Sequence, residues 1–161
     1  MIRDINLRRF RQEDWQAVKS LIYKTIDISY SEVYPVGAIE YFKNYHCEGN
    51  ILSDATKGYT IVLECSEGIV GTGTLLGTNI RRVFIDPSCQ HNGLGKLIMY
   101  DLEERALAEK VAVLGLEASL VSKQFYESLD YISREETYIP VRNEQKLSYY
   151  IMVKRINDNT T

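Results

Sequence analysis

The chain has 161 residues, of which 45% are hydrophobic and 25% are charged. This composition fits a globular protein and excludes wholesale disorder. Lysine and arginine number 19 against 22 acidic residues, so the formal net charge is −3. This balance argues against partners that are nucleic acids or anionic membranes, because binding to either needs an excess of positive charge.

The cysteines Cys47, Cys65 and Cys89 are odd in number and form no Cys-x-x-Cys pair. The sequence therefore predicts neither a disulfide framework nor a metal site. The first residues contain no apolar segment of the signal-peptide type, and no run approaches the ~20 apolar residues of a membrane span. We therefore expect a cytoplasmic protein.

The first 57 residues are predicted to be mainly helical. A short strand is expected over Ile2–Leu7, followed by an amphipathic helix over about Glu13–Ile28, where apolar residues recur at helical spacing. Pro35 is well placed as the first residue of a second helix. Residues 43–57 are polar, and we expect them to be irregular, with at most one turn near Ile51.

The remaining sequence is predicted to contain strands in a meander and then alternating helices and strands. Tight turns separate the apolar segments Tyr59–Cys65, Ile69–Leu76 and Ile80–Ile85, which indicates antiparallel pairing. We expect one α+β domain over residues 1–161, with residues 156–161 forming a frayed polar tail. The other expected elements are a helix from Leu94 to about Glu109, a strand over Val111–Ala118, a helix over Leu120–Leu129, and strands over Thr137–Val141 and Lys146–Lys154.

A loop with two glycines lies between the third strand of the meander and the long helix. It reads Gln90-His91-Asn92-Gly93-Leu94-Gly95-Lys96. The N–H groups at a helix N-terminus are unpaired and carry partial positive charge, so they can bind a phosphate, and glycines let the backbone come close to it. The alternative is an ordinary tight turn. The spacing fits neither the P-loop nor the dinucleotide-binding Gly-x-Gly-x-x-Gly.

Together with a second segment, this loop resembles the GNAT superfamily of acetyl-CoA-dependent N-acyltransferases. The pyrophosphate loop of that family has the pattern (Arg/Gln)-x-x-Gly-x-(Gly/Ala), which residues 90–95 match throughout, and Phe84-Ile85-Asp86-Pro87 is similar to the strand end before it. Ala118-Ser119 and Phe125-Tyr126-Glu127 are similar to the family's next conserved segment. The resemblance implies a mostly antiparallel mixed sheet, flanked by helices and splayed between its fourth and fifth strands.

The resemblance also implies where the cosubstrate acetyl-CoA binds. The backbone of Val83 and Ile85 would pair with the pantetheine arm in the gap between the two strands. The N–H groups of residues 91–96 would bind the pyrophosphate, and Lys96 would add charge. The implied cofactor-binding residues are Val83, Phe84, Ile85, Gln90, His91, Asn92, Gly93, Leu94, Gly95, Lys96 and Ser119.

The sequence departs from the family pattern at two places. Ser119 stands where the family usually has Asn, which would weaken one contact to the cofactor. Asp130-Tyr131 stands where the family has Gly-Phe. That glycine position favours a left-handed cap, which Asp tolerates less well than Gly.

Tyr126 is the expected general acid. In a helix, Ser119, Ser122 and Tyr126 fall at i, i+3 and i+7 and form a polar stripe, which by itself also fits a half-buried tyrosine anchored by its hydroxyl. The match to Phe-Tyr-Glu favours catalysis: a phenol stays protonated at neutral pH and can protonate the departing thiolate of CoA. We expect direct transfer, because no cysteine occupies a recognisable nucleophile position.

The general base and the acceptor site are less sharply indicated. Glu117 is the first candidate for the base and Glu64 the second, and for each the alternative is a solvated carboxylate. Tyr30 and Glu32, between the first two helices, are the candidate substrate residues. Their charge and aromatic rings would suit a cationic amine, and the alternative is a polar interhelix loop.

The sequence thus predicts an N-acetyltransferase that moves the acetyl group of acetyl-CoA to a primary amine, on a small molecule or a protein, within a ternary complex. One alternative is a non-catalytic acyl-CoA-binding regulatory module. Another is a nucleotide-binding domain that uses the Gly93 loop for a different phosphate. Exposed strand edges and tyrosine-rich helices would permit a homodimer.

Overall fold

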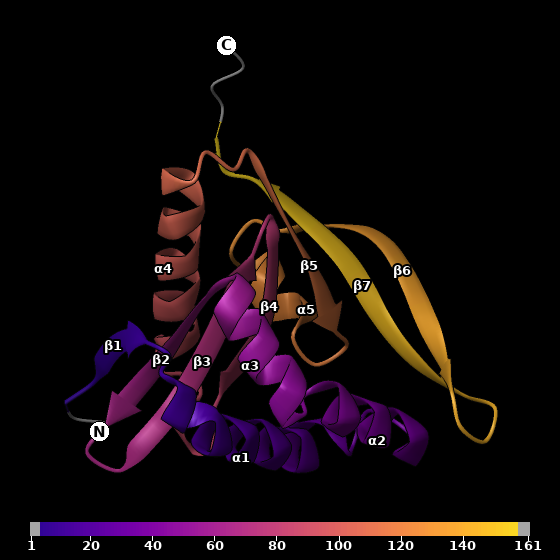
Figure 1. Cartoon of the computed structure of the whole chain (residues 1–161). Coiled ribbons are helices and arrows are strands. Elements are labelled where there is room, and N and C mark those ends of the chain that lie inside the picture. Colours follow the sequence, from indigo (N-terminus) through magenta and orange to yellow (C-terminus); the bar gives the residue numbers. More distant parts are fainter. Residues whose placement is uncertain (1–3, 158–161) are drawn as a thin grey trace.

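A computed structural model describes residues 4–157 and confirms the expected α+β class. Seven strands form one sheet in the order β1-β2-β3-β4-β5-β7-β6, with helices on both faces (Figure 1). The strands are β1 Asn6–Arg9, β2 Tyr59–Cys65, β3 Gly68–Leu76, β4 Asn79–Ile85, β5 Val113–Ser119, β6 Ile132–Val141 and β7 Gln145–Arg155. The helices are α1 Trp15–Thr25, α2 Val36–Tyr45, α3 Glu48–Lys57, α4 Leu94–Ala108 and α5 Lys123–Glu127.

The sheet opens between β4 and β5, as expected. These strands are parallel, and their Cα partners are confined to Asn79 with Gly115 and Ile80 with Leu116. The cause is a bulge in β4. Thr72 of β3 pairs with Phe84 and Thr74 pairs with Arg81, so β4 has one extra residue there, and Arg82 has a φ of 58°. Such a bulge bends the strand and strengthens its twist. Residues 81–85 of β4 therefore diverge from β5 and leave a gap in the sheet.

Two hydrophobic clusters cover the two faces of the sheet. Strand β2 shows the alternation directly, since Ile61 and Leu63 belong to the cluster under α4 whereas Val62 belongs to the cluster under α1. Helix α4 buries Ile98, Met99, Leu102 and Ala106 completely in the first cluster, and α1 buries Val18 and Ile22 completely in the second. The sheet therefore lies between two clusters of buried apolar side chains.

The prediction of an irregular segment over residues 43–57 is wrong, because Glu48–Lys57 forms helix α3. Only Ile51 of this helix is buried, so its apolar periodicity is too weak to be recognised in the sequence. Tertiary contacts stabilise the helix instead: Ile51 packs in the α1 cluster, and Asp54 forms an ion pair with Arg82 of β4.

The helix predicted over Leu120–Leu129 is much shorter in the structure. Helix α5 covers Lys123–Glu127, and Ser119 ends the preceding strand. Val121, which lies before α5 but within the predicted helix, is 40% exposed. Strand β6 begins at Ile132, five residues before the predicted Thr137. Residues 132–136 are all exposed and show no apolar alternation, so the sequence pattern did not predict them as part of the strand.

The two ends of the described chain also differ in detail from prediction. Strand β1 covers Asn6–Arg9 rather than Ile2–Leu7, and Ile2 lies outside the described residues. The N–H groups of Ile156 and Asn157 both donate to the carbonyl of Ala112, so these two residues are anchored, while residues 158–161 of the predicted tail lie outside the described range.

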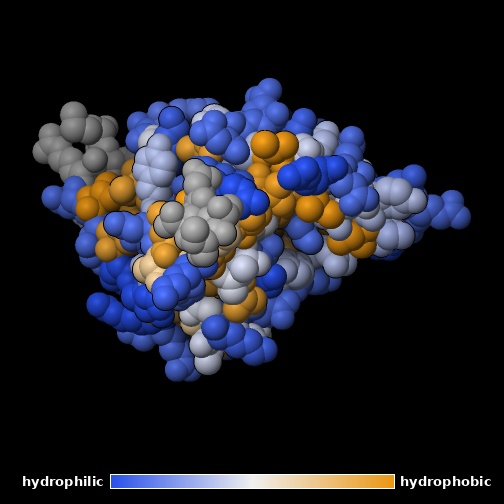
Figure 2. Space-filling model, turned by 90° about the horizontal axis from the view of Figure 1, so that it is seen from above, coloured by the Kyte–Doolittle hydropathy of each residue, from blue (hydrophilic) through white to orange (hydrophobic). Residues whose placement is uncertain are grey.

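The surface mixes polar and apolar residues. Seen from above, hydrophobic residues lie in small areas among hydrophilic ones, and the β6–β7 hairpin extends to one side (Figure 2). Ile132 and Tyr138 of this hairpin are 62% and 49% exposed. No helix within residues 4–157 combines the length and the apolar character that a membrane span requires.

Candidate active site

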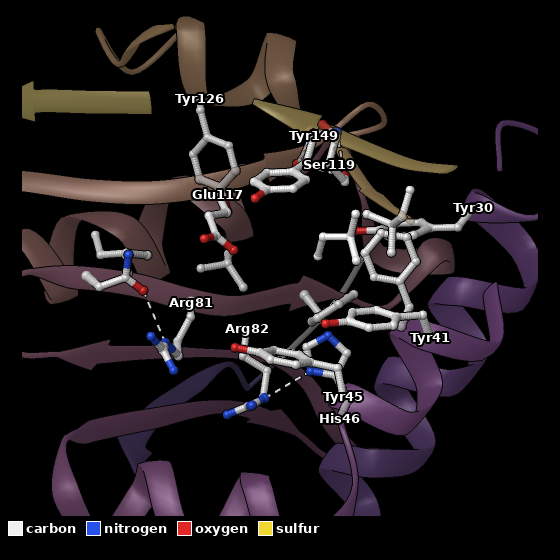
Figure 3. Close-up of a pocket in the computed structure, with 18 residues that line it drawn as sticks. Tyr30, Tyr41, Tyr45, His46, Arg81, Arg82, Glu117, Ser119, Tyr126 and Tyr149 are labelled. Atoms are coloured by element: carbon white, nitrogen blue, oxygen red, sulfur yellow. Dashed lines mark hydrogen bonds between the residues drawn. The ribbon is translucent and has the colours of Figure 1, made fainter. Parts of the chain in front are cut away.

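Two cavities meet beside the gap between β4 and β5. The larger has a volume of about 640 Å³ and lies between the end of β4, the Gly93 loop and α5. The smaller has a volume of about 160 Å³ and lies between α2, β4, β5 and β7 (Figure 3). Five residues line both cavities: Tyr30, Val83, Phe84, Ser122 and Tyr126. A molecule in the larger cavity can therefore reach one in the smaller cavity at Val83 and Tyr126.

The larger cavity contains nearly all of the residues predicted to bind the cofactor. Val83, Phe84 and Ile85 line it from β4. The predicted loop residues that line it are Gln90, His91, Gly93, Leu94, Gly95 and Lys96. Two predicted residues do not: the side chain of Asn92 donates to the carbonyls of Cys89 and Gln90, and Ser119 lines the smaller cavity.

The Gly93 loop presents a row of unpaired backbone donors. Within residues 4–157, the N–H groups of residues 91–96 donate no hydrogen bond. His91 and Gly93 have φ values of 66° and 77°, and α4 begins directly after Gly93. The Gln90 amide donates to the Ile85 carbonyl at 3.1 Å, which ties the loop to β4. Free N–H groups at a helix N-terminus fit a phosphate group.

Glycine is needed at positions 93 and 95 for different structural reasons. A Cβ on Gly93 would meet no described atom within 4 Å, but the φ of 77° favours glycine. A Cβ on Gly95 would lie 2.9 Å from Cζ of Phe125. Glycine at position 95 therefore allows α5 to pack against the start of α4, and this packing places Tyr126 beside the loop.

Tyr126 extends from α5 toward the smaller cavity (Figure 3) and is 7% exposed. Its ring packs edge-on against Tyr131. Burial, and to a lesser degree the neighbouring Tyr30, raises the pKa of the Tyr126 phenol well above its usual range. The phenol is therefore protonated throughout the neutral range, and within the described residues its hydroxyl makes no hydrogen bond that would occupy it.

The turn before α5 is fixed by short polar contacts. The hydroxyls of Ser119 and Ser122 are 2.9 Å apart, and the Ser122 N–H donates to the Ser119 hydroxyl. The Tyr34 hydroxyl accepts from the Leu120 N–H at 2.8 Å and donates to the Ser148 carbonyl at 2.7 Å. After α5, Asp130 adopts the left-handed conformation of the family's glycine position, with a φ of 71°, although Asp tolerates it less well than Gly.

The smaller cavity combines one carboxylate with a basic wall. Glu117 projects from the exposed side of β5 into the cavity, and Arg81 and Arg82 of β4 lie across from it (Figure 3). Nε of Arg82 donates to Nδ1 of His46 at 3.0 Å. Burial, with the adjacent Arg82 charge, lowers the pKa of His46 to about 3. His46 is therefore a neutral imidazole at physiological pH.

The other predicted catalytic and substrate residues have different surroundings. Glu64 forms an ion pair with Arg8 at 3.0 Å and lines neither cavity. Glu32 is exposed and also lines neither cavity, whereas Tyr30 is buried and lines both. Among the predicted catalytic and substrate residues, the structure thus brings Tyr30, Glu117 and Tyr126 together at the smaller cavity.

Several residues that line the smaller cavity were not predicted from the sequence. The adjacent arginines in an otherwise apolar strand were a usable signal for Arg81 and Arg82. His46 offered none, because it becomes part of the cavity only through the packing of α2 and α3 on β4. Three tyrosines that also line the smaller cavity were likewise not predicted: Tyr41, Tyr45 and Tyr149.

Comparisons with known proteins identify the family. Residues 25–154 match the model described as the acetyltransferase (GNAT) domain. No curated protein sequence matches the chain.

Solved structures show the same fold at low sequence identity. A GCN5-related N-acetyltransferase from Rhodopseudomonas palustris superposes with a TM-score of 0.86 at 18% identity, over 96% of this chain and 98% of that one. The Salmonella typhimurium protein yncA, solved with its cofactor acetyl-CoA, gives 0.67 at 13% identity over 98% and 96%. The ribosomal-protein-S18-alanine N-acetyltransferase of Escherichia coli gives 0.70 at 16% identity over 98% and 99%. With its residues 25–154 matching the family model, this chain belongs to the GNAT acetyltransferase family.

Proposed function

We propose that this protein transfers the acetyl group of acetyl-CoA directly to a primary amine within a ternary complex. The observation that carries the proposal is the meeting of the two cavities at Tyr126. A cofactor in the larger cavity and an acceptor in the smaller one would both reach this phenol. Direct transfer then needs no acyl-enzyme, and geometry alone supplies much of the rate by holding the reactants together.

The larger cavity fits acetyl-CoA in both chemistry and size. The unpaired N–H groups of residues 91–96 suit the pyrophosphate. The edge of β4 that faces the gap is unpaired beyond Ile80, so Val83 and Ile85 can pair with an extended pantetheine arm as an added strand would. About 640 Å³ accommodates a large ligand.

The proposed chemistry has Glu117 and Tyr126 handling protons while the acceptor nitrogen attacks the thioester carbonyl. A C–N bond forms and the C–S bond breaks. Glu117, directly or through water, takes one proton from the incoming ammonium, and Tyr126 gives a proton to the departing sulfur. The nitrogen loses its second proton after attack, so the products are the acetamide, the CoA thiol and one released proton.

We also propose a cytoplasmic location. The unpaired Cys47, Cys65 and Cys89 fit a reducing compartment.

The test is an assay of the purified protein with acetyl-CoA and a panel of primary amines, reading released CoA thiol and the mass of the N-acetyl product. We expect turnover with at least one amine and no acetylated protein when acetyl-CoA is present alone. A competent acetyl-protein would contradict direct transfer. Tight acetyl-CoA binding without transfer to any amine would favour the regulatory module instead.

A further inference from the structure

The basic wall of the smaller cavity carries more donors than the protein itself uses. Arg81 and Arg82 share one carboxylate oxygen, Oδ2 of Asp54, at 3.4 and 2.8 Å. Arg82 is 3% exposed in its side chain, and its Nη2 is buried without a hydrogen-bond partner among the described residues. Two guanidinium charges against one carboxylate leave this wall with an excess of one positive charge.

His46 presents a donor on the same wall. Because an arginine Nε always carries hydrogen, its contact with Nδ1 of His46 requires a lone pair on that nitrogen. The neutral ring must then carry its hydrogen on Nε2. No described residue accepts from Nε2, and this nitrogen turns toward the cavity (Figure 3). His46 is thus fixed as a donor and cannot be the general base.

The opposite wall has the opposite charge. Glu117 forms no ion pair with a described residue and points into the cavity (Figure 3). The cavity therefore separates one negative group from a wall with one excess positive charge. Its volume of about 160 Å³ is close to the ~150 Å³ of a protein cavity that binds benzene, so the cavity admits a ligand of amino-acid size.

We propose that the acceptor is a small primary amine that carries a carboxylate, of the α-amino acid type. Its amine lies at Glu117, and its carboxylate accepts from Nε2 of His46 against the positive wall of Arg81 and Arg82. This rests on the proposed acetyl transfer and names the substrate class for that same site. The carboxylate orients the amine toward the junction at Tyr126, and a simple alkylamine or a polyamine leaves the Nε2 donor of His46 unpaired.

The experiment compares matched acceptors with the full chain and saturating acetyl-CoA. Each set contains an amino acid, its carboxamide and its decarboxylated amine, for example alanine, alaninamide and ethylamine, or phenylalanine, phenylalaninamide and phenethylamine; spermidine is a separate arm. We expect kcat/KM for the best amino acid to exceed that of its decarboxylated amine by about 100-fold or more, since a site built for a polar group discriminates strongly against its loss.

Substitutions in the basic wall test whether its residues cause the preference for a carboxylate. His46→Gln and the more exposed Arg81→Gln should each lower the preference for carboxylate over decarboxylated amine by about tenfold or more, and Arg81→Gln serves if the buried substitution prevents folding. Arg134→Gln is the matched control, because Arg134 is exposed on β6 and lines neither cavity; it should leave the preference unchanged.

The outcomes separate this inference from the proposed function. Equal or better transfer to decarboxylated amines or to spermidine overturns the carboxylate assignment while acetyl transfer stands. A carboxylate preference that survives both variants also overturns the assignment to this wall. No transfer to any amine, with acetyl-CoA still bound, overturns both.

Discussion

Removing a single oxygen atom from Tyr126 tests its proposed role as the general acid. Tyr126→Phe keeps the ring that packs against Tyr131 but removes the proton proposed for the departing thiolate. General acid catalysis contributes about 10²–10⁴-fold, so we expect kcat to fall within that range while the affinity for acetyl-CoA changes little. Single-turnover acetylation of the best acceptor measures the chemical step. Wild-type rates in that assay would make Tyr126 a packing residue only.

The buried state of the same phenol predicts the shape of the pH profile. Burial raises the pKa of Tyr126 above its ordinary value near 10, so the acid form persists when the amine and the base have already lost their protons. We therefore expect the pH profile of kcat to show no descending limb below about pH 10. A fall between pH 7 and 9 in the protein that remains folded would assign the acid role to another group.

Substitutions of the two glycines Gly93 and Gly95 should have different effects, because Gly93 lies in the loop before α4 and Gly95 contacts α5. Gly93→Val places a side chain beside unpaired donors in a left-handed conformation, which costs about 1–2 kcal/mol of stability. We expect it to abolish the rise in melting temperature that acetyl-CoA gives by binding the native state. Gly77→Val is the control, because Gly77 has a φ of 62°, open space around its Cβ and no place in either cavity. An intact thermal shift in Gly93→Val would remove the cofactor from this loop.

Gly95→Ala tests the contact between α4 and α5. Its Cβ would lie 2.9 Å from Phe125, so the ring and α5 must shift, at a cost of about 1–3 kcal/mol. Because α5 also carries Tyr126, we expect kcat to fall more than acetyl-CoA affinity does. Gly49→Ala in α3, where a Cβ would meet nothing within 4 Å, should leave both unchanged. Unaltered kcat in Gly95→Ala would show that this packing does not position the phenol.

The whole molecule divides into a part that the sequence predicts and a part that only folding creates. The meander, α4 and the Gly93 loop were predictable because turn residues, apolar periodicity and a contiguous motif lie within short stretches of chain. Helix α3 was missed because one buried residue, Ile51, and an ion pair to β4 stabilise it. The wall of the smaller cavity joins His46, Asp54 and Arg82, which come from three elements, and no local pattern encodes that juxtaposition.

The burial of His46 in this wall makes the stability of the whole chain depend on pH. The pKa of His46 is about 3 in the folded chain and about 6.5 when unfolded. As the pH falls below about 6.5, the unfolded chain binds a proton that the folded chain does not bind until about pH 3. The free energy of unfolding should therefore be fully retained above pH 6.5 and should fall by up to about 1.4 kcal/mol per pH unit between those values.

Urea unfolding of the wild type and of His46→Gln at intervals from pH 4 to 8 measures this contribution. The variant keeps a polar side chain beside Arg82 but cannot titrate, so its free energy of unfolding should vary less with pH between 4 and 6.5. The pKa values of Asp14 and Asp86, lowered by Arg8 and by Ser88 and Lys24 respectively against the effect of burial, add a slope shared by both proteins at the acid end. Parallel curves for the two proteins over pH 4–6.5 would show that His46 titrates normally, and that it is not held as a neutral donor in the wall.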